Sequence, residues 1–193
     1  MTQSISNQST VAPHRNIISS AIGLKESAFA PDVLKSGFVA SLNLPPLGAK
    51  LEPLLISSIL EAWKRFPVLV FPKQSLNPTE LARFTQQLGS FGYDPYVKAI
   101  DQHSNVIEVR REATETTPIF GQSWHSDWSF QPIPPSGTLL QSKVIPPVGG
   151  DTVFANMYMA YESLSPAMQT LLQPLKGIHT AGPAYGPRGL FSK

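Results

Sequence analysis

Prolines and glycines interrupt this chain so often that they limit the folds it can adopt more than any other feature does. The 193 residues include 19 prolines and 13 glycines. Proline cannot continue a helix interior or a central strand, so most elements must be short and joined by turns. Short elements of this kind favour a β-rich α+β fold with a few helices packed on the sheets.

Two segments carry the periodicity of amphipathic helices. The first begins at Pro53, which suits an opening helical turn, and ends before Pro67. The second follows Asn77, which has Glu80 three residues later in the pattern of a capping box, and it ends at Gly89. Both helices present one apolar face, so we expect them to pack on a sheet.

Apolar runs and alternating patterns predict strands in most of the remaining chain. In chain order the expected strands are 38–44, 68–71, 106–110, 123–130, 138–144, 151–155 and 177–180. Shorter helices are expected after the capping residues Asn156 and Ser165. Gly182 to Lys193 is expected to be a loop. Residues 1–20 are mostly polar and predict a disordered tail, which leaves 21–193 as one domain.

Composition excludes several classes of function. There is no cysteine, so disulfides, thiolate metal sites and cysteine nucleophiles are excluded. The net charge is +2 without a basic run, so no nucleic-acid partner is expected. No signal-peptide pattern or membrane-spanning apolar run occurs, so we expect a cytoplasmic protein without membrane association. The sequence is compatible with a homo-oligomer.

The main chemical signal is a histidine and a carboxylate two residues apart in an aromatic stretch. His125 and Asp127 lie between Trp124 and Phe130. On a strand, both would point to the same face, close enough to hold one divalent cation. Trp124 would then face the core. The alternative is a strand histidine that is simply hydrogen-bonded to Asp127, because such a tripeptide also arises by chance.

Three short patterns together resemble the taurine dioxygenase and 2,4-dichlorophenoxyacetate dioxygenase family. They are Trp124-His125-Ser126-Asp127, then Pro135-Ser136-Gly137, then Gly149-Gly150-Asp151-Thr152. Members of this family are iron(II)- and 2-oxoglutarate-dependent oxygenases that release succinate and CO2. The resemblance implies a double-stranded β-helix, or jelly roll, with helices outside it.

The resemblance also implies roles for individual residues. His125 and Asp127 would be the first two ligands of Fe(II), and O2 and 2-oxoglutarate would be cosubstrates. Thr152 would donate a hydrogen bond to the distal carboxylate of 2-oxoglutarate, since a buried carboxylate needs donors. The simpler reading of Thr152 is a β-branched strand residue.

Substrate contacts are expected from Asp94, Tyr96 and Trp128. The acid at Asp94 would repel a sulfonate, and Trp128 and Phe130 suit an apolar or aromatic small molecule, so taurine is not the expected substrate. A straight strand would point Trp128 away from the iron. A substrate role for this residue therefore requires the chain to bend there, and core packing is the alternative.

The family's third ligand, a histidine, and its 2-oxoglutarate-binding arginine lie on later strands than this sequence reaches. We therefore expect 21–193 to be the N-terminal portion of such a domain, with a jelly roll incomplete at its C-terminus. His179 and Arg188 have the family's order, but we do not expect them to be the substitutes, because Arg188 stands between Pro187 and Gly189 in a pattern typical of a loop.

Two other classes of function stay open from the sequence. The chain could be an inactive or regulatory remnant of the same fold. It could also be another metal-dependent jelly-roll protein, for example a hydrolytic one, since zinc accepts the same ligands.

Overall fold

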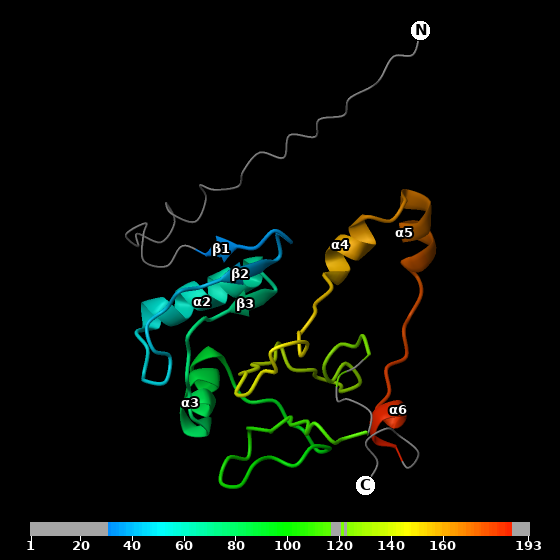
Figure 1. The fold of residues 1–193 in the computed structure, drawn as a ribbon. Helices are drawn as coiled ribbons and strands as arrows, with labels where there is room; N and C mark the ends of the chain where they lie inside the picture. The colour runs from blue at the N-terminus through cyan, green and yellow to red at the C-terminus, as the bar shows by residue number, and fades with distance from the viewer. Residues whose placement is uncertain (1–30, 117–120, 122, 187–193) are drawn as a thin grey trace.

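The computed structural model describes residues 31–116, 121 and 123–186 (Figure 1). The tail predicted for 1–20 lies outside this part of the chain. None of the helices in the described residues is both long and apolar enough to cross a membrane.

A small three-stranded sheet begins the described part of the chain. β1 (Asp32–Val33) pairs antiparallel with β2 (Val39–Ser41), and β2 pairs parallel with β3 (Val68–Val70). Ala40 in the middle strand is fully buried. A parallel pair needs a crossover connection, and α2 (Pro53–Arg65) supplies it.

The two amphipathic helices form where the sequence predicts them. α2 has proline in its first turn, and α3 (Pro78–Leu88) follows the predicted capping box. The Asn77 side chain accepts the Glu80 N–H at 2.9 Å, and the Glu80 carboxylate accepts the Asn77 N–H at 2.8 Å. These two bonds satisfy N–H groups that a helix start leaves without partners.

The buried core lies between the sheet, α2 and α3. Phe84 of α3 meets Phe71 edge-on, with ring centres 5.7 Å apart. The side-chain carbonyl oxygens of Gln74 and Gln87 accept backbone N–H groups of the loop before α2. The core residues are Leu47, Leu51, Ile59, Leu76 and Phe84.

The second half of the chain has three short helices and little other regular structure. α4 (Met157–Glu162) and α5 (Pro166–Leu172) begin after Asn156 and Ser165, whose side chains accept helix N–H groups as predicted. α6 (Gly182–Tyr185) lies in a stretch that the sequence predicted to be a loop. Figure 1 shows α4 and α5 set apart from the sheet and α2.

Apolar side chains of 144–178 are mostly exposed, and we call this stretch the exposed apolar segment. Ile178, Val144 and Val148 are 94%, 91% and 88% exposed. Apolar side chains in water contribute nothing to the core. The stability of the described part therefore comes mainly from the first half of the chain.

Five predicted strands are not formed, and those predictions were wrong for the described residues. The five segments are 106–110, 123–130, 138–144, 151–155 and 177–180. Side-chain alternation favours an extended backbone, but a strand also needs a neighbouring strand to pair with, and none of these segments pairs with one in the part of the chain described here. The segments 38–44 and 68–71 are confirmed as β2 and β3, each shorter than predicted.

Candidate metal site

The stretch 123–130 is a series of turns rather than the predicted strand. Trp128 has a φ of +46°, in the left-handed region that residues other than glycine rarely adopt. Its carbonyl oxygen accepts the Gln131 N–H at 3.0 Å, which closes a turn. The chain therefore bends at Trp128, directly after Asp127, and this bend is what a substrate role for Trp128 requires.

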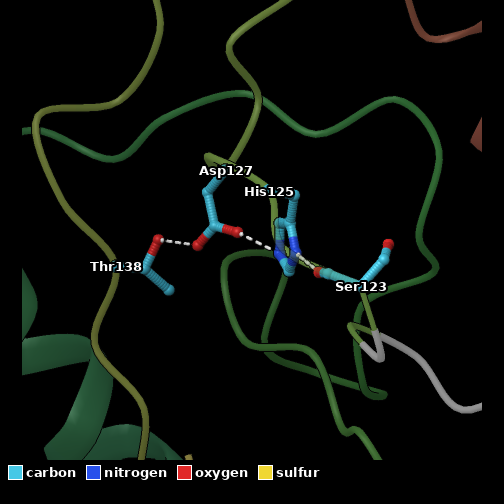
Figure 2. Close-up of polar contacts among 4 residues, drawn as sticks. All are labelled: Ser123, His125, Asp127 and Thr138. Carbon is cyan, nitrogen blue, oxygen red and sulfur yellow. Dashed lines mark hydrogen bonds and ion pairs between the residues drawn. The ribbon is translucent and has the colours of Figure 1, made fainter. Parts of the chain in front are cut away.

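His125 and Asp127 nevertheless meet. His125 Nε2 lies 3.1 Å from Asp127 Oδ1, and His125 Nδ1 lies 2.7 Å from the Ser123 carbonyl oxygen (Figure 2). A carbonyl oxygen can only accept, so Nδ1 carries the proton of this hydrogen bond. Ser123 thereby selects the tautomer and directs Nε2 at the carboxylate.

Thr138 holds the other oxygen of the same carboxylate. Its hydroxyl donates to Asp127 Oδ2 at 2.7 Å, as Figure 2 shows. The His125 ring and the Asp127 carboxylate are thus each oriented by a residue outside the pair, as protein metal ligands usually are. No sequence pattern predicted a role for Ser123 or Thr138. Thr138 directly follows the Pro135-Ser136-Gly137 pattern, which was the available signal.

Thr138 is fixed by its neighbours on the chain. Gly137 lies so close to the indole of Trp63 in α2 that a Cβ at Gly137 would be 2.2 Å from the ring. Leu139 packs against the buried core, and Lys143 donates to a backbone carbonyl just before α3. These contacts attach the site to the best-packed part of the molecule.

The donors suit a divalent cation. With Nδ1 protonated, His125 Nε2 and Asp127 Oδ1 direct lone pairs at the same position, which a proton or a cation must occupy. The two side chains are 48% and 40% exposed, so an ion and a small cosubstrate can reach them. Imidazole nitrogen with carboxylate oxygen matches the donor types of non-haem iron(II) sites.

A third ligand is not found among the described residues, since no three His, Cys, Asp or Glu side chains there come together as a metal site. His179 is near the motif without joining the pair, and its Nδ1 lies 2.7 Å from Ser129 Oγ. Arg188 lies outside the described residues. His103 lines a different feature, a shallow cavity of about 350 Å³ beside α3.

Thr152 is exposed and makes no hydrogen bond within the part of the chain that the structure describes. Gly149 and Gly150, which precede it, have φ values of +80° and +78°. This backbone is left-handed, so the two glycines serve as the tight connection that the sequence predicts. The strand predicted to follow them does not form.

Two of the predicted substrate residues, Asp94 and Tyr96, lie in one cluster with a residue that the sequence did not indicate. Tyr96 stacks on Tyr185 of α6, with ring centres 4.5 Å apart and planes 15° apart, and it meets Phe130 edge-on at 5.6 Å. Asp94 Oδ1 accepts the backbone N–H groups of Tyr96 at 2.8 Å and Val97 at 3.2 Å. Nothing in the local sequence pattern pointed to Tyr185.

Electrostatics connect this cluster to the His125–Asp127 pair. Burial raises the pKa of the Tyr185 hydroxyl above its usual value, and the charges of Asp94 and then Asp127 raise it further. Both carboxylates, one from a predicted substrate residue and one from a predicted metal ligand, therefore act on the same phenol.

Trp124 is 71% exposed, so its prediction as a core residue was wrong. That prediction depended on a strand, in which neighbouring residues face opposite sides. The turns observed in 123–130 remove that alternation.

Comparison with known proteins gives the class. Residues 31–191 match the family described as "Taurine catabolism dioxygenase TauD, TfdA family". The chain belongs to this family. The matched region includes both halves of the structure and the His125–Asp127 pair. Membership implies Fe(II), with 2-oxoglutarate and O2 as cosubstrates.

Individual relatives extend beyond the matched region. The (S)-phenoxypropionate/alpha-ketoglutarate-dioxygenase of Sphingobium herbicidovorans is 26% identical, over 62% of this chain and 42% of that protein. A taurine dioxygenase structure from Burkholderia xenovorans is 28% identical with a TM-score of 0.61, over 76% of this chain and 52% of that one. A structure of AAD-2 in complex with Mn(II) and N-oxalylglycine is 25% identical with a TM-score of 0.56, over 75% and 53%. The chain therefore spans about half the length of these relatives.

Proposed function

We propose that the protein acts as an Fe(II)- and 2-oxoglutarate-dependent dioxygenase on a small organic substrate, with His125 and Asp127 as two of the metal ligands. The observation that carries this proposal is the oriented pair. His125 Nε2 and Asp127 Oδ1 lie 3.1 Å apart. The Ser123 carbonyl oxygen accepts a hydrogen bond from His125 Nδ1, and the Thr138 hydroxyl donates one to Asp127 Oδ2. A His–Asp contact with only a structural role does not need a second residue to orient each side chain. Here Ser123 and Thr138 orient both, so that the lone pairs of His125 Nε2 and Asp127 Oδ1 point to one position.

Each residue of the site has a distinct part in this function. His125 and Asp127 would bind the metal, and Ser123 and Thr138 would orient them. Iron bound there would supply the activation of O2 with 2-oxoglutarate as reductant. The protein's own contribution is positioning, because holding a substrate beside the metal can account for a large part of a rate enhancement.

Thr152 is the proposed hydrogen-bond donor to the distal carboxylate of 2-oxoglutarate. Its hydroxyl is exposed and makes no bond to another described residue, so it is available to a ligand. The ligand bound to the AAD-2 structure, N-oxalylglycine, differs from 2-oxoglutarate only by an NH in place of a CH2 group. This supports a dicarboxylate of that size for the family site.

Asp94, Tyr96 and Trp128 are the proposed substrate contacts. The chain bends at Trp128, as a substrate role requires, and the buried Nε1–H of Trp128 makes no hydrogen bond within the described residues. A buried donor without a partner is costly unless a ligand supplies an acceptor.

The test is an anaerobic titration of the full chain with Fe(II) and 2-oxoglutarate, followed by visible absorption of the resulting chelate. The expected result is a weak charge-transfer band for the natural sequence, absent from His125→Ala and Asp127→Ala. His103→Ala is the matched control, because His103 lies beside α3 and away from the pair. A band that survives Asp127→Ala would disprove the ligand assignment. A band without succinate release on admitting O2 would support the inactive-remnant alternative instead.

A further inference from the structure

Three aromatic rings from three distant parts of the chain meet beside Asp127. Tyr96 follows α3, Phe130 follows the His125–Asp127 motif, and Tyr185 ends α6. The Tyr185 ring stacks on Tyr96 at 4.5 Å and meets Phe130 at 6.2 Å, with planes 66° apart. The Tyr185 ring thus covers one face of Tyr96 and one side of Phe130. A flat molecule bound at this position would contact the same two surfaces.

Two anchors hold the segment 179–186 against the motif. At one end His179 Nδ1 lies 2.7 Å from Ser129 Oγ, and at the other end Tyr185 completes the stack. The chain turns tightly directly after Tyr185, since a Cβ on Gly186 would lie 2.7 Å from the Gly182 carbonyl oxygen. The segment contributes one aromatic ring and a short helix, and it lacks the buried apolar anchors of α2 and α3.

The surroundings of the rings are negative. Asp94 Oδ2 is buried and has no hydrogen-bond partner within the described residues, while Oδ1 accepts two backbone N–H groups. The pKa of Tyr185 is raised by burial and by Asp94 and Asp127, so both carboxylates act where the rings meet. An anionic group bound beside Asp94 would be repelled, whereas a hydrogen-bond donor or a cation would meet an unused acceptor.

We propose that the Tyr185 ring holds the place of the substrate's own ring, and that the substrate is a planar aromatic compound whose group next to Asp94 is neutral or cationic. This inference rests on the proposed function, because it places the substrate beside Asp127. Tyr185 is then a specificity-determining residue. A substrate ring enters by replacing Tyr185 on Tyr96, and the segment 179–186 moves while His179 keeps it attached.

The test uses the full chain and three probes with one skeleton and different charge, namely 2-phenylethylamine, 2-phenylethanol and 3-phenylpropionate. Their affinities are measured by NMR titration without iron or 2-oxoglutarate. We expect the amine and the alcohol to bind, and the carboxylate to bind at least about tenfold more weakly. Tyr185→Ala should tighten amine and alcohol binding by about two- to tenfold, the usual worth of an aromatic pair.

Three further variants separate the alternatives. Tyr185→Phe keeps the ring and should leave the affinities unchanged, and Tyr96→Ala should abolish binding. Tyr158→Ala is the matched control, since Tyr158 is 79% exposed on α4. Weaker probe binding in Tyr185→Ala would mean that Tyr185 contacts the substrate instead of being replaced by it, and would overturn the proposal. Equal affinity for all three probes would also overturn it. Because these measurements need no metal, a failed succinate assay would count against the proposed function alone.

Discussion

Thr138 binds Asp127 across eleven residues of chain, through a 2.7 Å hydrogen bond from its hydroxyl to Oδ2. The bond leaves Oδ1 directed at His125, so the threonine decides which carboxylate oxygen is offered to a cation. Loss of an orienting partner of this kind typically costs about 10- to 100-fold in metal affinity. Thr138→Val should weaken Fe(II) binding by that factor in an anaerobic titration. Thr138→Ser, which keeps the hydroxyl, should bind as the natural sequence does, and equal weakening of both variants would contradict the role.

Gly137→Ala should destabilise the fold and disturb the site together. The added methyl would lie 2.2 Å from the Trp63 ring, so the ring or the chain must move. Overpacking of this kind costs about 1–3 kcal/mol. Denaturant unfolding followed by Trp fluorescence gives the loss of stability. The same substitution at Gly89, where a Cβ would meet nothing within 4 Å, is the matched control and should cost less. Equal losses at both positions would refute the contact.

Tyr185 should be among the last tyrosines to ionise as pH rises. Burial and the charges of Asp94 and Asp127 raise its pKa in the folded state, so the folded chain holds this proton more tightly than the unfolded chain. The stabilising contribution is complete below the unfolded pKa of about 10 and is lost as pH rises through the folded pKa. Absorbance at 295 nm should show one late transition that Tyr185→Phe removes. If the absorbance titration of Tyr185→Phe still shows the late transition, the assignment of that transition to Tyr185 is wrong.

Charged residues placed in the exposed apolar segment should reduce self-association without lowering stability. Ile178 and Val148 are 94% and 88% exposed, so replacing either by Asp removes no buried contact. Sedimentation should show less association for Ile178→Asp and Val148→Asp, with an unchanged Tm. Phe84→Asp is the opposite control, since Phe84 is 2% exposed and a buried charge should unfold the chain. A lowered Tm in Ile178→Asp would mean that the side chain packs in solution.

Local signals predicted the helices well, because their determinants lie within a few residues. Asn77 and Glu80 form the capping box, and Asn156 and Ser165 cap the helices expected after them. The two strands that were confirmed, β2 and β3, pair with each other, and only α2 and its short connections separate them in the sequence. Strands in the second half depend on partners that local sequence cannot specify, so alternation alone overpredicted them.

The site was predicted only in part, for a similar reason. His125 and Asp127 do meet, although the strand expected to align them is replaced by turns. Their orienting residues are a backbone carbonyl two residues away and a hydroxyl eleven residues away, and neither has a distinctive pattern. Tyr185 comes from 55 residues beyond Phe130, and only the fold brings the two rings together.

The buried apolar residues of the described chain all lie between Ala40 and Phe84, and this has a consequence for the order of folding. Later residues add little to the apolar faces of the unit formed by β2, α2, β3 and α3: Leu139 packs against the core, and Gly137 lies against the Trp63 ring. During synthesis it can fold while the motif is still being made, and in the finished chain it should be the last part to exchange its amide hydrogens. Residues 123–138 would then open and close on a surface that is already rigid, so unfolding of the loop that carries His125 and Asp127 need not mean loss of the fold.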